Sequence, residues 1–347
     1  MQSISELDKN FKVETKIGKS DIRFYNVRSA PFKIYGIFFE QDRFRRLPEA
    51  VAKEVSEGVY GLHAHTAGGR VRFRTDSPYV AIHAKMPRVG RMPHFALCGS
   101  SGFDLYVEDR YITSFVPHVD MTDGYEGVKP LGAAKMREIT INFPSYSNVS
   151  ELYIGLQENA AVEEPAPYKR EVPIVYYGSS ITQGGCSSRP GSAYPNIVSR
   201  EFDTDFINLG FSGNAKAETA MGAYIKDLPM SVFVYDYDHN APTLSHLEQT
   251  HERMFLQIRQ AQPDLPIVLM SRPKYTLSED DRARLAVIRK TYENARACGD
   301  QNVYLIDGPT LMAIAGNEGT VDGTHPTDLG FFSMAQALIP VLKEILK

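Results

Sequence analysis

The spacing of apolar residues changes near the middle of this chain, and that change restricts the fold more than any other feature. From about residue 20 to residue 157, apolar and polar residues alternate over short segments that Gly, Pro, Asp and Ser clusters separate. Alternation places every second side chain on one face of a strand, as a sheet with one buried face requires. The pattern therefore predicts that the first half is an antiparallel β-sandwich, of the jelly-roll-like kind.

The segment GRVRFRTD shows what this alternation predicts for individual side chains. Val71 and Phe73 are expected to face the core of the sandwich, and Arg70, Arg72 and Arg74 are expected to point outward. The nearby segment LHAHT has the same spacing, so its two histidines are predicted to lie on an outward strand face. Because two histidines lack the further ligands that a metal site needs, no metal is predicted there.

From residue 172 the pattern changes to a continuously apolar strand followed by an amphipathic helix, and this unit occurs five times. Strands that are apolar throughout are typical of a sheet that is covered by helices on both faces. Five such units in succession predict a parallel, doubly wound, flavodoxin-like α/β domain. The predicted strands are VPIVYY, FINL, SVFVYD, PIVLM and VYLID, which begin near residues 172, 206, 231, 266 and 303.

A proline-punctuated segment without periodicity, QENAAVEEPAPYKREVP, separates the two patterns. Segments of this composition commonly connect structured elements. The sequence therefore predicts a β-sandwich domain over residues 1–160, a linker over 161–171 and an α/β domain over 172–347.

Charge and cysteine content argue against several classes of partner. The net charge is −4 without a basic face or tail, so nucleic-acid binding is not expected. No window approaches the ~18 apolar residues of a membrane-spanning helix, and the start of the chain lacks the segments of a signal peptide. The three cysteines form no CxxC pair, which is typical of a reducing compartment. We expect a cytoplasmic protein without membrane partners, and homo-oligomers are left open.

Polar residues suited to catalysis follow each of the five predicted strands. In a parallel sheet, ligands bind beyond the carboxyl ends of the strands, so these residues are expected to meet at one rim. The loop after the first strand, GSSITQGG, lacks the lysine and the spacing of nucleotide-binding loops, and Thr182 replaces the second glycine of a GxSxG turn. The polar loops cover residues 178–184, 210–214, 236–240, 271–273 and 322–325.

Together these loops supply the groups that acyl transfer needs. A hydroxyl from one of the two serines of GSSIT is a weak nucleophile that must pass its proton to a base, and His325 is able to accept it. Asp322, three residues earlier, is placed to hold the other ring nitrogen of that histidine. Preorganised donors must then stabilise the oxyanion, and the candidates are the N–H groups of Ser180 and Gly213 and the side-chain amide of Asn240.

Four further residues border these groups and are predicted to contact the substrate. Gln183 and Asn214 flank the candidate nucleophile and the oxyanion glycine, and His239 and Arg272 lie on the same rim. An ion pair within the protein is an equally good interpretation for Arg272. The acidic residues and the histidine of DYDHN also suggest a metal site, but a serine mechanism accounts for the rim without any metal or cofactor.

The motifs on this rim resemble those of the SGNH, or GDSL-type, hydrolases. GSSIT, at 178–182, is similar to the first block of that family, whose nucleophile occupies the third position, although Ser179 stands where the family usually has aspartate. NLGFSG, at 208–213, is similar to the second block, and DGTHP, at 322–326, is similar to the last. The resemblance covers residues from about 170 to 347.

The resemblance implies a role for each candidate residue. It selects the second serine of GSSIT, Ser180, as the nucleophile, and it makes Asp322 and His325 the other members of a catalytic triad. It assigns the oxyanion hole to the Ser180 N–H, Gly213 and Asn240, although Asn240 lies in DYDHN rather than in the family's common GxND. No cofactor and no metal take part in such a mechanism.

The first half carries a resemblance of its own. GFDLY, at 102–106, is similar to the GxDLY signature of a sandwich domain that precedes some SGNH hydrolase domains. Members with this architecture are mostly carbohydrate esterases that remove acetyl groups, with occasional acyltransferases. The resemblance therefore implies a serine esterase that hydrolyses acetyl esters of carbohydrates, with a small-molecule or oligosaccharide ester as its substrate. An acyltransferase with the same triad and a non-catalytic carbohydrate-binding protein are the alternatives.

Overall fold

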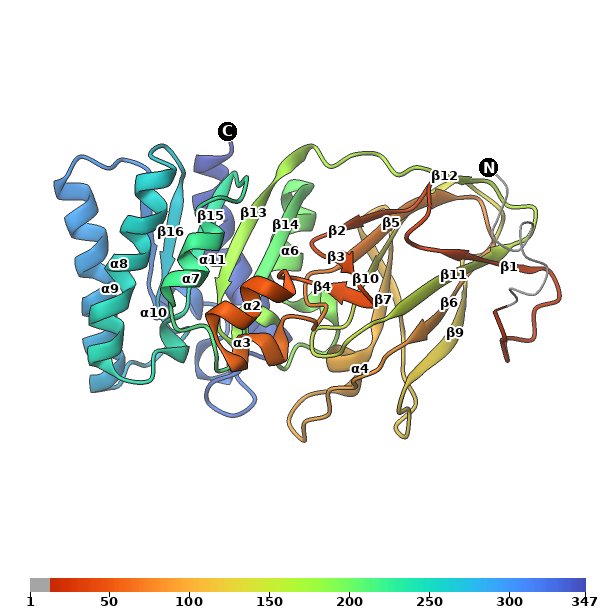
Figure 1. Cartoon of the computed structure of the whole chain (residues 1–347), viewed down its shortest axis with the longest axis horizontal. Helices are drawn as coiled ribbons and strands as arrows, with labels where there is room; N and C mark the ends of the chain where they lie inside the picture. The colour runs from red at the N-terminus through yellow and green to blue at the C-terminus, as the bar shows by residue number, and fades with distance from the viewer. Residues whose placement is uncertain (1–12) are drawn as a thin grey trace.

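A β-rich unit and an α/β unit lie side by side in the structure (Figure 1). The structure is a computed structural model, and it describes residues 13–347. The predicted sandwich domain begins at residue 1 and the signal-peptide prediction concerns the same end of the chain, so both fall partly on residues 1–12, outside the described residues. The last strand of the β-rich unit ends at Glu163, and the first strand of the parallel sheet begins at Arg170.

Two antiparallel sheets form the N-terminal half, and this confirms the predicted sandwich. Their strands are β1 (Ile22–Asn26), β2 (Lys33–Tyr35), β5 (Arg70–Thr75), β6 (Tyr79–Lys85), β7 (Phe103–Val107), β8 (Arg110–Phe115), β9 (Gly124–Pro130), β10 (Arg137–Asn142), β11 (Glu151–Gln157) and β12 (Val162–Glu163). One sheet has the order β1-β11-β6-β9, and the other has the order β12-β5-β10-β7-β8 with β2 beside β5. Alternate residues of both sheets, such as Ile82, Ile154, Phe73 and Ile141, are fully buried in one common core.

Three further short elements of the N-terminal half accompany the sandwich. A hairpin and a short helix accompany the two sheets, and they are β3 (Phe38–Glu40), β4 (Arg43–Arg45) and α4 (Leu97–Ser101). Phe44 of the hairpin is fully buried against Phe143, with 5.2 Å between the ring centroids. The hairpin therefore extends the core of the sandwich.

Five parallel strands form the sheet of the C-terminal half, as predicted. They are β13 (Arg170–Gly178), β14 (Thr204–Gly210), β15 (Val232–Asp236), β16 (Ile267–Met270) and β17 (Val303–Ile306). Their order is β14-β13-β15-β16-β17, which is the flavodoxin-like order 2-1-3-4-5. Ile174 and Tyr176 of β13 face one helical layer while Val175 and Tyr177 face the other, and all four are fully buried. Burial on both faces explains why these strands show no polar alternation.

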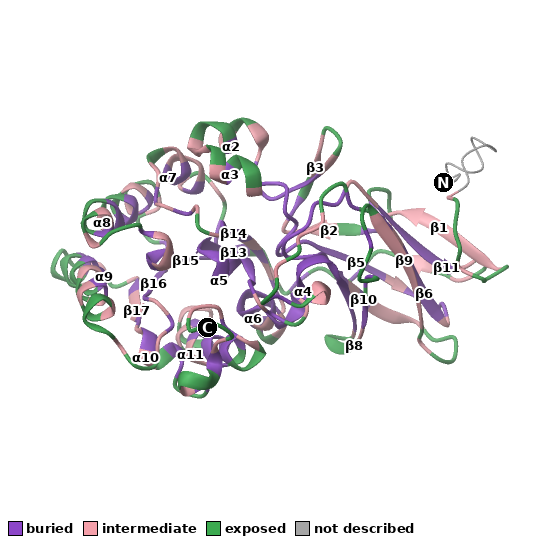
Figure 2. Cartoon of the chain, turned by 90° about the horizontal axis from the view of Figure 1, so that it is seen from below, coloured by how far each residue is buried: buried purple, intermediate pink, exposed green. Residues whose placement is uncertain are grey.

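Helices cover both faces of this sheet (Figure 2). One face is covered by α6 (Tyr194–Phe202), α10 (Gly308–Leu311) and α11 (Asp328–Ile345). The other is covered by α7 (Thr219–Ile225), α8 (Leu244–Ala261) and α9 (Glu279–Ala297). Four short helical turns lie in the connecting loops, namely α5 (Ser180–Gln183), η1 (Pro190–Ser192), η2 (Asp238–Asn240) and η3 (Gly316–Gly319).

Two helices from the N-terminal half pack on the α/β sheet rather than on the sandwich. They are α2 (Glu49–Val55) and α3 (Glu57–Leu62), and α2 contacts α7. Leu47, Ala52 and Val59 are fully buried in the same core as Tyr177 and Phe211. The range 1–160, which the sequence assigns to the sandwich, thus contains a segment that completes the core of the other unit. The apolar face of a short helix does not identify the sheet that it will cover.

The outer face of the sandwich differs from the prediction at two of its arginines. Arg70, Arg72 and Arg74 point away from the sandwich core, as expected, but Arg70 and Arg72 are 2% and 5% exposed. Arg70 forms an ion pair with Asp205 of the α/β unit. The guanidinium of Arg72 lies 4.1 Å from the ring centroid of Tyr168. These arginines line the interface between the two halves, where the alternating pattern alone predicts solvent.

The prediction that LHAHT is an outward strand face is wrong. Helix α3 ends at Leu62, and His63 and His65 in the turn that follows are 5% and 4% exposed. His63 Nδ1 lies 2.5 Å from the Tyr60 carbonyl oxygen. A period of two over five residues is too short to distinguish a strand from the end of a helix.

Arg46 joins the two halves from an enclosed position. Its side chain is 2% exposed, and burial lowers its pKa to about 9. Its guanidinium donates hydrogen bonds of 2.6–3.1 Å to four backbone carbonyls, those of Leu62, His65, Asn208 and Gly210. Because two of these carbonyls belong to β14, which is an edge strand of the parallel sheet, one side chain joins the N-terminal half to the carboxyl end of that strand.

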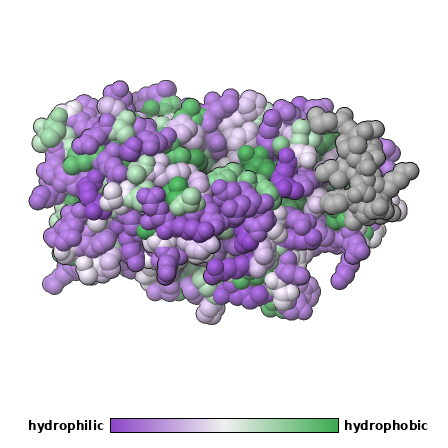
Figure 3. Space-filling model, in the orientation of Figure 1, coloured by the Kyte–Doolittle hydropathy of each residue, from purple (hydrophilic) through white to green (hydrophobic). Residues whose placement is uncertain are grey.

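Hydrophilic residues cover most of the face shown in Figure 3, and hydrophobic residues appear there in small separate groups. Within residues 13–347, no helix is long and apolar enough to cross a membrane. The cytoplasmic compartment and the oligomeric state stay predictions of the sequence.

Candidate active site

Ser180 begins the short helix that follows β13. Ser179 caps this helix, because its hydroxyl accepts a hydrogen bond of 3.1 Å from the Ile181 N–H, and its side chain is fully buried. The Ser180 hydroxyl lies 2.9 Å from Nε2 of His325. Of the two candidate serines, Ser180 is therefore the one that meets the imidazole. Ser180 is only 8% exposed, although a residue on the rim of the sheet is expected to be exposed.

Asp322 orients the imidazole from the other side. Its Oδ2 lies 2.7 Å from His325 Nδ1, and its Oδ1 accepts the N–H groups of His325 and Thr324 at 2.7 and 2.9 Å. Partial burial raises the pKa of Asp322, but these hydrogen bonds outweigh it and lower the pKa to about 2. The carboxylate is thus ionised at neutral pH and accepts the Nδ1 proton, which leaves the Nε2 lone pair toward the Ser180 hydroxyl.

The three predicted oxyanion donors follow neighbouring strands. The Ser180 N–H is the first of helix α5, and within the described residues neither it nor the Gly213 N–H has an acceptor in the protein. Gly213 has φ +69°, and a side chain there would meet nothing within 4 Å. One amide hydrogen of Asn240 bonds the Phe211 carbonyl at 2.8 Å, which leaves its second hydrogen available. Asn240 therefore lies against the loop that carries Gly213.

Gln183 connects the nucleophile helix to the same loop. Its Oε1 accepts the Ser212 N–H at 3.0 Å. Its amide nitrogen lies 3.1 Å from His65 Nδ1 and 3.1 Å from the Ser145 carbonyl, and both of these partners belong to the N-terminal half. Because these contacts occupy both amide hydrogens, Gln183 orders the site rather than offering a donor to substrate. The Asn214 amide similarly bonds the Ser212 carbonyl at 2.7 Å.

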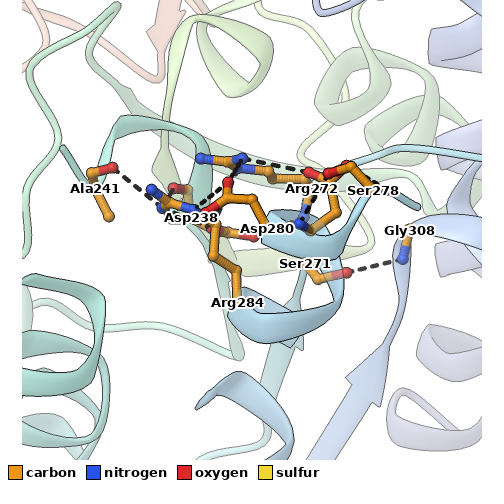
Figure 4. Close-up of polar contacts among 9 residues, drawn as sticks. Asp238, Ala241, Ser271, Arg272, Ser278, Asp280, Arg284 and Gly308 are labelled. Carbon is orange, nitrogen blue, oxygen red and sulfur yellow. Dashed lines mark hydrogen bonds and ion pairs between the residues drawn. The ribbon is translucent and has the colours of Figure 1, made fainter. Parts of the chain in front are cut away.

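Arg272 is held by carboxylates, which agrees with the ion-pair interpretation (Figure 4). Its Nη1 lies 2.9 Å from Asp280, and its backbone N–H donates to Asp238 at 3.1 Å. Arg284 bonds the same two aspartates and the Ala241 carbonyl. The network fixes the loop after β16 beside the 3₁₀ turn that carries Asn240.

The carboxylates of DYDHN do not converge on a metal site. Asp236 accepts hydrogen bonds from Thr182 and Tyr194 at 2.9 and 3.1 Å, whereas Asp238 meets the arginines. Burial and the nearby Arg272 lower the pKa of His239 to about 3. Its Nε2 is buried, and in the described part of the chain it has no hydrogen-bond partner. His239 is thus a neutral imidazole, and its substrate contact stays a prediction.

Three side chains at the site were not predicted. The Tyr146 hydroxyl donates to the Ser180 carbonyl at 3.1 Å, and the His94 ring lies 5.5 Å from that of His325. Burial and the Asp322 carboxylate raise the pKa of Cys186 to about 12, so this thiol is protonated at neutral pH and does not compete as a nucleophile. Tyr146 and His94 come from the N-terminal half, and no motif marks them.

Fold and site together define the class of this protein. A doubly wound sheet with serine, histidine and aspartate in hydrogen-bonding sequence beyond its strand ends is the architecture of an α/β esterase. The chain belongs to the GDSL-like lipase/acylhydrolase family, whose sequence model matches residues 171–343. A second model, described as the N-terminus of SGNH-hydrolase-type esterases, matches residues 22–162. The predicted family and the predicted enzyme class are thus confirmed.

Solved structures share the whole two-part architecture. One of them is the structure of a putative GDSL-like lipase from Bacteroides ovatus. It is 29% identical to this chain with a TM-score of 0.83, and the match covers 94% of this chain and 98% of the lipase chain. The salicylyl-acyltransferase SsfX3 from a tetracycline biosynthetic pathway is 20% identical with a TM-score of 0.77, covering 94% and 98%. An acetyl xylan esterase from Butyrivibrio proteoclasticus is 13% identical with a TM-score of 0.60, covering 94% and 99%. No curated protein matches the chain.

Proposed function

We propose that this protein is a serine esterase that removes acetyl groups from carbohydrates through an acyl-enzyme on Ser180. The observation that carries the proposal is the sequence of contacts from the Ser180 hydroxyl to His325 Nε2, and from His325 Nδ1 to Asp322, at 2.9 and 2.7 Å. An ionised Asp322 fixes the tautomer that a base needs, and Ser180 is the hydroxyl that this base reaches.

The proposed reaction has two steps. Ser180 attacks the ester carbonyl while His325 accepts its proton, and the tetrahedral oxyanion lies among the N–H groups of Ser180 and Gly213 and the free amide hydrogen of Asn240. The sugar alkoxide then leaves with the proton from His325. Water repeats the sequence on the acyl-enzyme and releases acetate, which returns the Ser180 hydroxyl to its original state.

Architecture supports a carbohydrate as the alcohol part of the substrate. Two-domain structures of similar topology include the acetyl xylan esterase and a family two carbohydrate esterase from Clostridium thermocellum in complex with cellohexaose. The test is a panel of acetylated mono- and oligosaccharides with released acetate measured for the wild-type protein and for Ser180→Ala. Release from no acetylated sugar, with continued cleavage of simple aryl acetates, would contradict the carbohydrate part of the proposal.

We expect acetyl esters to be cleaved at least about tenfold faster, in kcat/KM, than octanoyl esters. Ser180 is only 8% exposed, and Tyr146, Cys186 and His94 crowd its surroundings, so a short acyl group fits better than a long one. The measurement compares p-nitrophenyl esters of increasing chain length at subsaturating concentration. Faster turnover of the octanoyl ester would show that a long acyl channel exists.

Replacing Asn240 with alanine is expected to lower kcat by about 10²–10³-fold, with a much smaller change in KM. The amide hydrogen that is free in the resting enzyme is proposed to stabilise the oxyanion, which exists only after attack. Asn214→Ala is the matched control, because it removes the same side chain from a neighbouring loop and is expected to cost less than about tenfold. A kcat of Asn240→Ala within threefold of wild type, with an unchanged melting temperature, would remove Asn240 from the oxyanion hole.

Acyl transfer to an alcohol instead of water is the second candidate function. The similar architecture of the salicylyl-acyltransferase SsfX3 supports this candidate. The same residues would act, and the difference lies in which nucleophile reaches the acyl-enzyme. Product ratios with and without alcohol acceptors distinguish the two. Transfer that dominates over hydrolysis at millimolar acceptor would favour the acyltransferase.

A further inference from the structure

His94, Cys186 and His325 converge beside the nucleophile from three separate loops. One ligand atom of each lies within 4.8 Å of the others, and within the described residues this is the one group of three or more histidine, cysteine or acidic side chains so arranged. His94 is exposed, and the other two are partly buried. The proposed ester hydrolysis uses neither His94 nor Cys186, so their position next to the base calls for another explanation.

The chemistry of these donors suits a zinc ion. Imidazole nitrogen and thiolate sulfur are the ligands that Zn²⁺ prefers. Asp322 already holds Nδ1 of His325 at 2.7 Å, and a carboxylate on the far nitrogen is the arrangement that orients histidine ligands in metal sites. Because Asp322 bonds Nδ1, Nε2 of His325 is the nitrogen that is able to coordinate a metal.

The geometry needs only a small adjustment. Ligands at about 2.0–2.3 Å from a tetrahedral zinc stand roughly 3.3–3.8 Å apart, so the group must contract by about 1 Å. His94 is exposed on a loop and can supply that movement. Cys186 has φ +73°, a left-handed conformation that is uncommon for a residue other than glycine. The backbone thus holds this thiol near the imidazole at some conformational cost.

We propose that Zn²⁺ binds His94, Cys186 and Nε2 of His325 and thereby inhibits the enzyme reversibly. The thiol releases its proton to solvent as the zinc–sulfur bond forms, and a water molecule fills the fourth position. Coordination occupies the lone pair that otherwise accepts the Ser180 proton. The inhibition rests on the proposed function of His325 as the base, whereas the metal site itself does not.

Binding is tested with Co²⁺ as a spectroscopic substitute for zinc. A thiolate ligand produces a charge-transfer band in the near ultraviolet, which we expect in the wild-type protein, in Ser180→Ala and in Cys298→Ser. The band should disappear in Cys186→Ser, and Zn²⁺ should displace Co²⁺ wherever the band occurs. Cys298 is the matched control because it is an exposed cysteine outside the site. Absence of the band from the wild-type protein, or its persistence in Cys186→Ser, would overturn the proposal.

Inhibition is tested by zinc titration during cleavage of p-nitrophenyl acetate, with each variant normalised to its own metal-free rate. We expect the inhibition constant to rise at least about tenfold in Cys186→Ser and in His94→Asn, to stay unchanged in Cys298→Ser, and to be relieved by EDTA. Equal inhibition of wild type and Cys186→Ser would contradict the site. If the wild-type protein cleaves no ester, the proposed function fails, and the cobalt spectra still decide the metal site.

Discussion

Ser180→Ala is expected to lower kcat/KM for p-nitrophenyl acetate by about 10⁴-fold or more. The Ser180 hydroxyl lies 2.9 Å from His325 Nε2, and without it no acyl-enzyme forms. The free energy of unfolding should change by less than about 1 kcal/mol, because alanine fills the same space and loses a single side-chain hydrogen bond. Steady-state cleavage of p-nitrophenyl acetate measures kcat/KM, and urea unfolding of the same preparation measures the free energy of unfolding.

Ser179→Ala is the control that separates the two neighbouring serines. Its hydroxyl caps helix α5 and is fully buried, so its loss should cost about 1 kcal/mol of stability while most of the activity remains. A fluorophosphonate probe should label wild type and Ser179→Ala, but not Ser180→Ala. Full activity in Ser180→Ala, or labelling at another residue, would exclude the assigned nucleophile.

Arg46→Met is expected to lower the free energy of unfolding by about 3 kcal/mol or more. Methionine keeps part of the side-chain volume but donates no hydrogen bond, so buried carbonyls on both sides of the interface lose their donor. Each unsatisfied buried group costs roughly 1–3 kcal/mol, and removing the cost of burying the cation offsets only part of the sum. Urea unfolding followed by circular dichroism provides the measurement.

Arg43→Met is the matched control for this loss of a guanidinium. Arg43 lies three residues away, and its side chain is 31% exposed and paired with an exposed Asp42. Exposed ion pairs contribute little, so this variant should stay within about 1 kcal/mol of wild type. An Arg46→Met protein as stable as Arg43→Met would show that the enclosed guanidinium does not hold the two halves together.

The sequence predicts those parts of the fold in which burial is regular. The five strands of the parallel sheet contribute buried apolar residues to the cores on both of its faces, so their sequences are mostly apolar without alternation. Ser278 with Asp281 forms the capping box that begins α9, and the spacing of these two residues is recognisable in the sequence. The interface between the halves has no such regularity. From the sequence alone, Arg70 and Arg72 could equally well point into solvent. They are buried because Asp205 and Tyr168 pack against them in the folded protein.

The candidate site divides in the same way. Ser180, Asp322, His325 and Asn240 follow strand ends or lie in motifs, and the structure brings the first three into direct contact. Side chains that reach the site from the sandwich have no motif, and their contribution depends on how two domains dock. For Arg272, the carboxylates that bind its guanidinium belong to η2 and to the first turn of α9, and the sequence alone does not show that these two elements are adjacent.

The helical pair α2 and α3 has a consequence for any attempt to recombine this enzyme with its relatives. A fragment that starts at the linker retains every residue proposed to react with ester, yet it leaves Tyr177 and Phe211 without the cover that Leu47, Ala52 and Val59 provide. A chimera that exchanges the N-terminal halves of two relatives at residue 161 would place the helical pair of one protein on the α/β sheet of the other. The unit that can be exchanged as a block is thus the sandwich without its helical insertion.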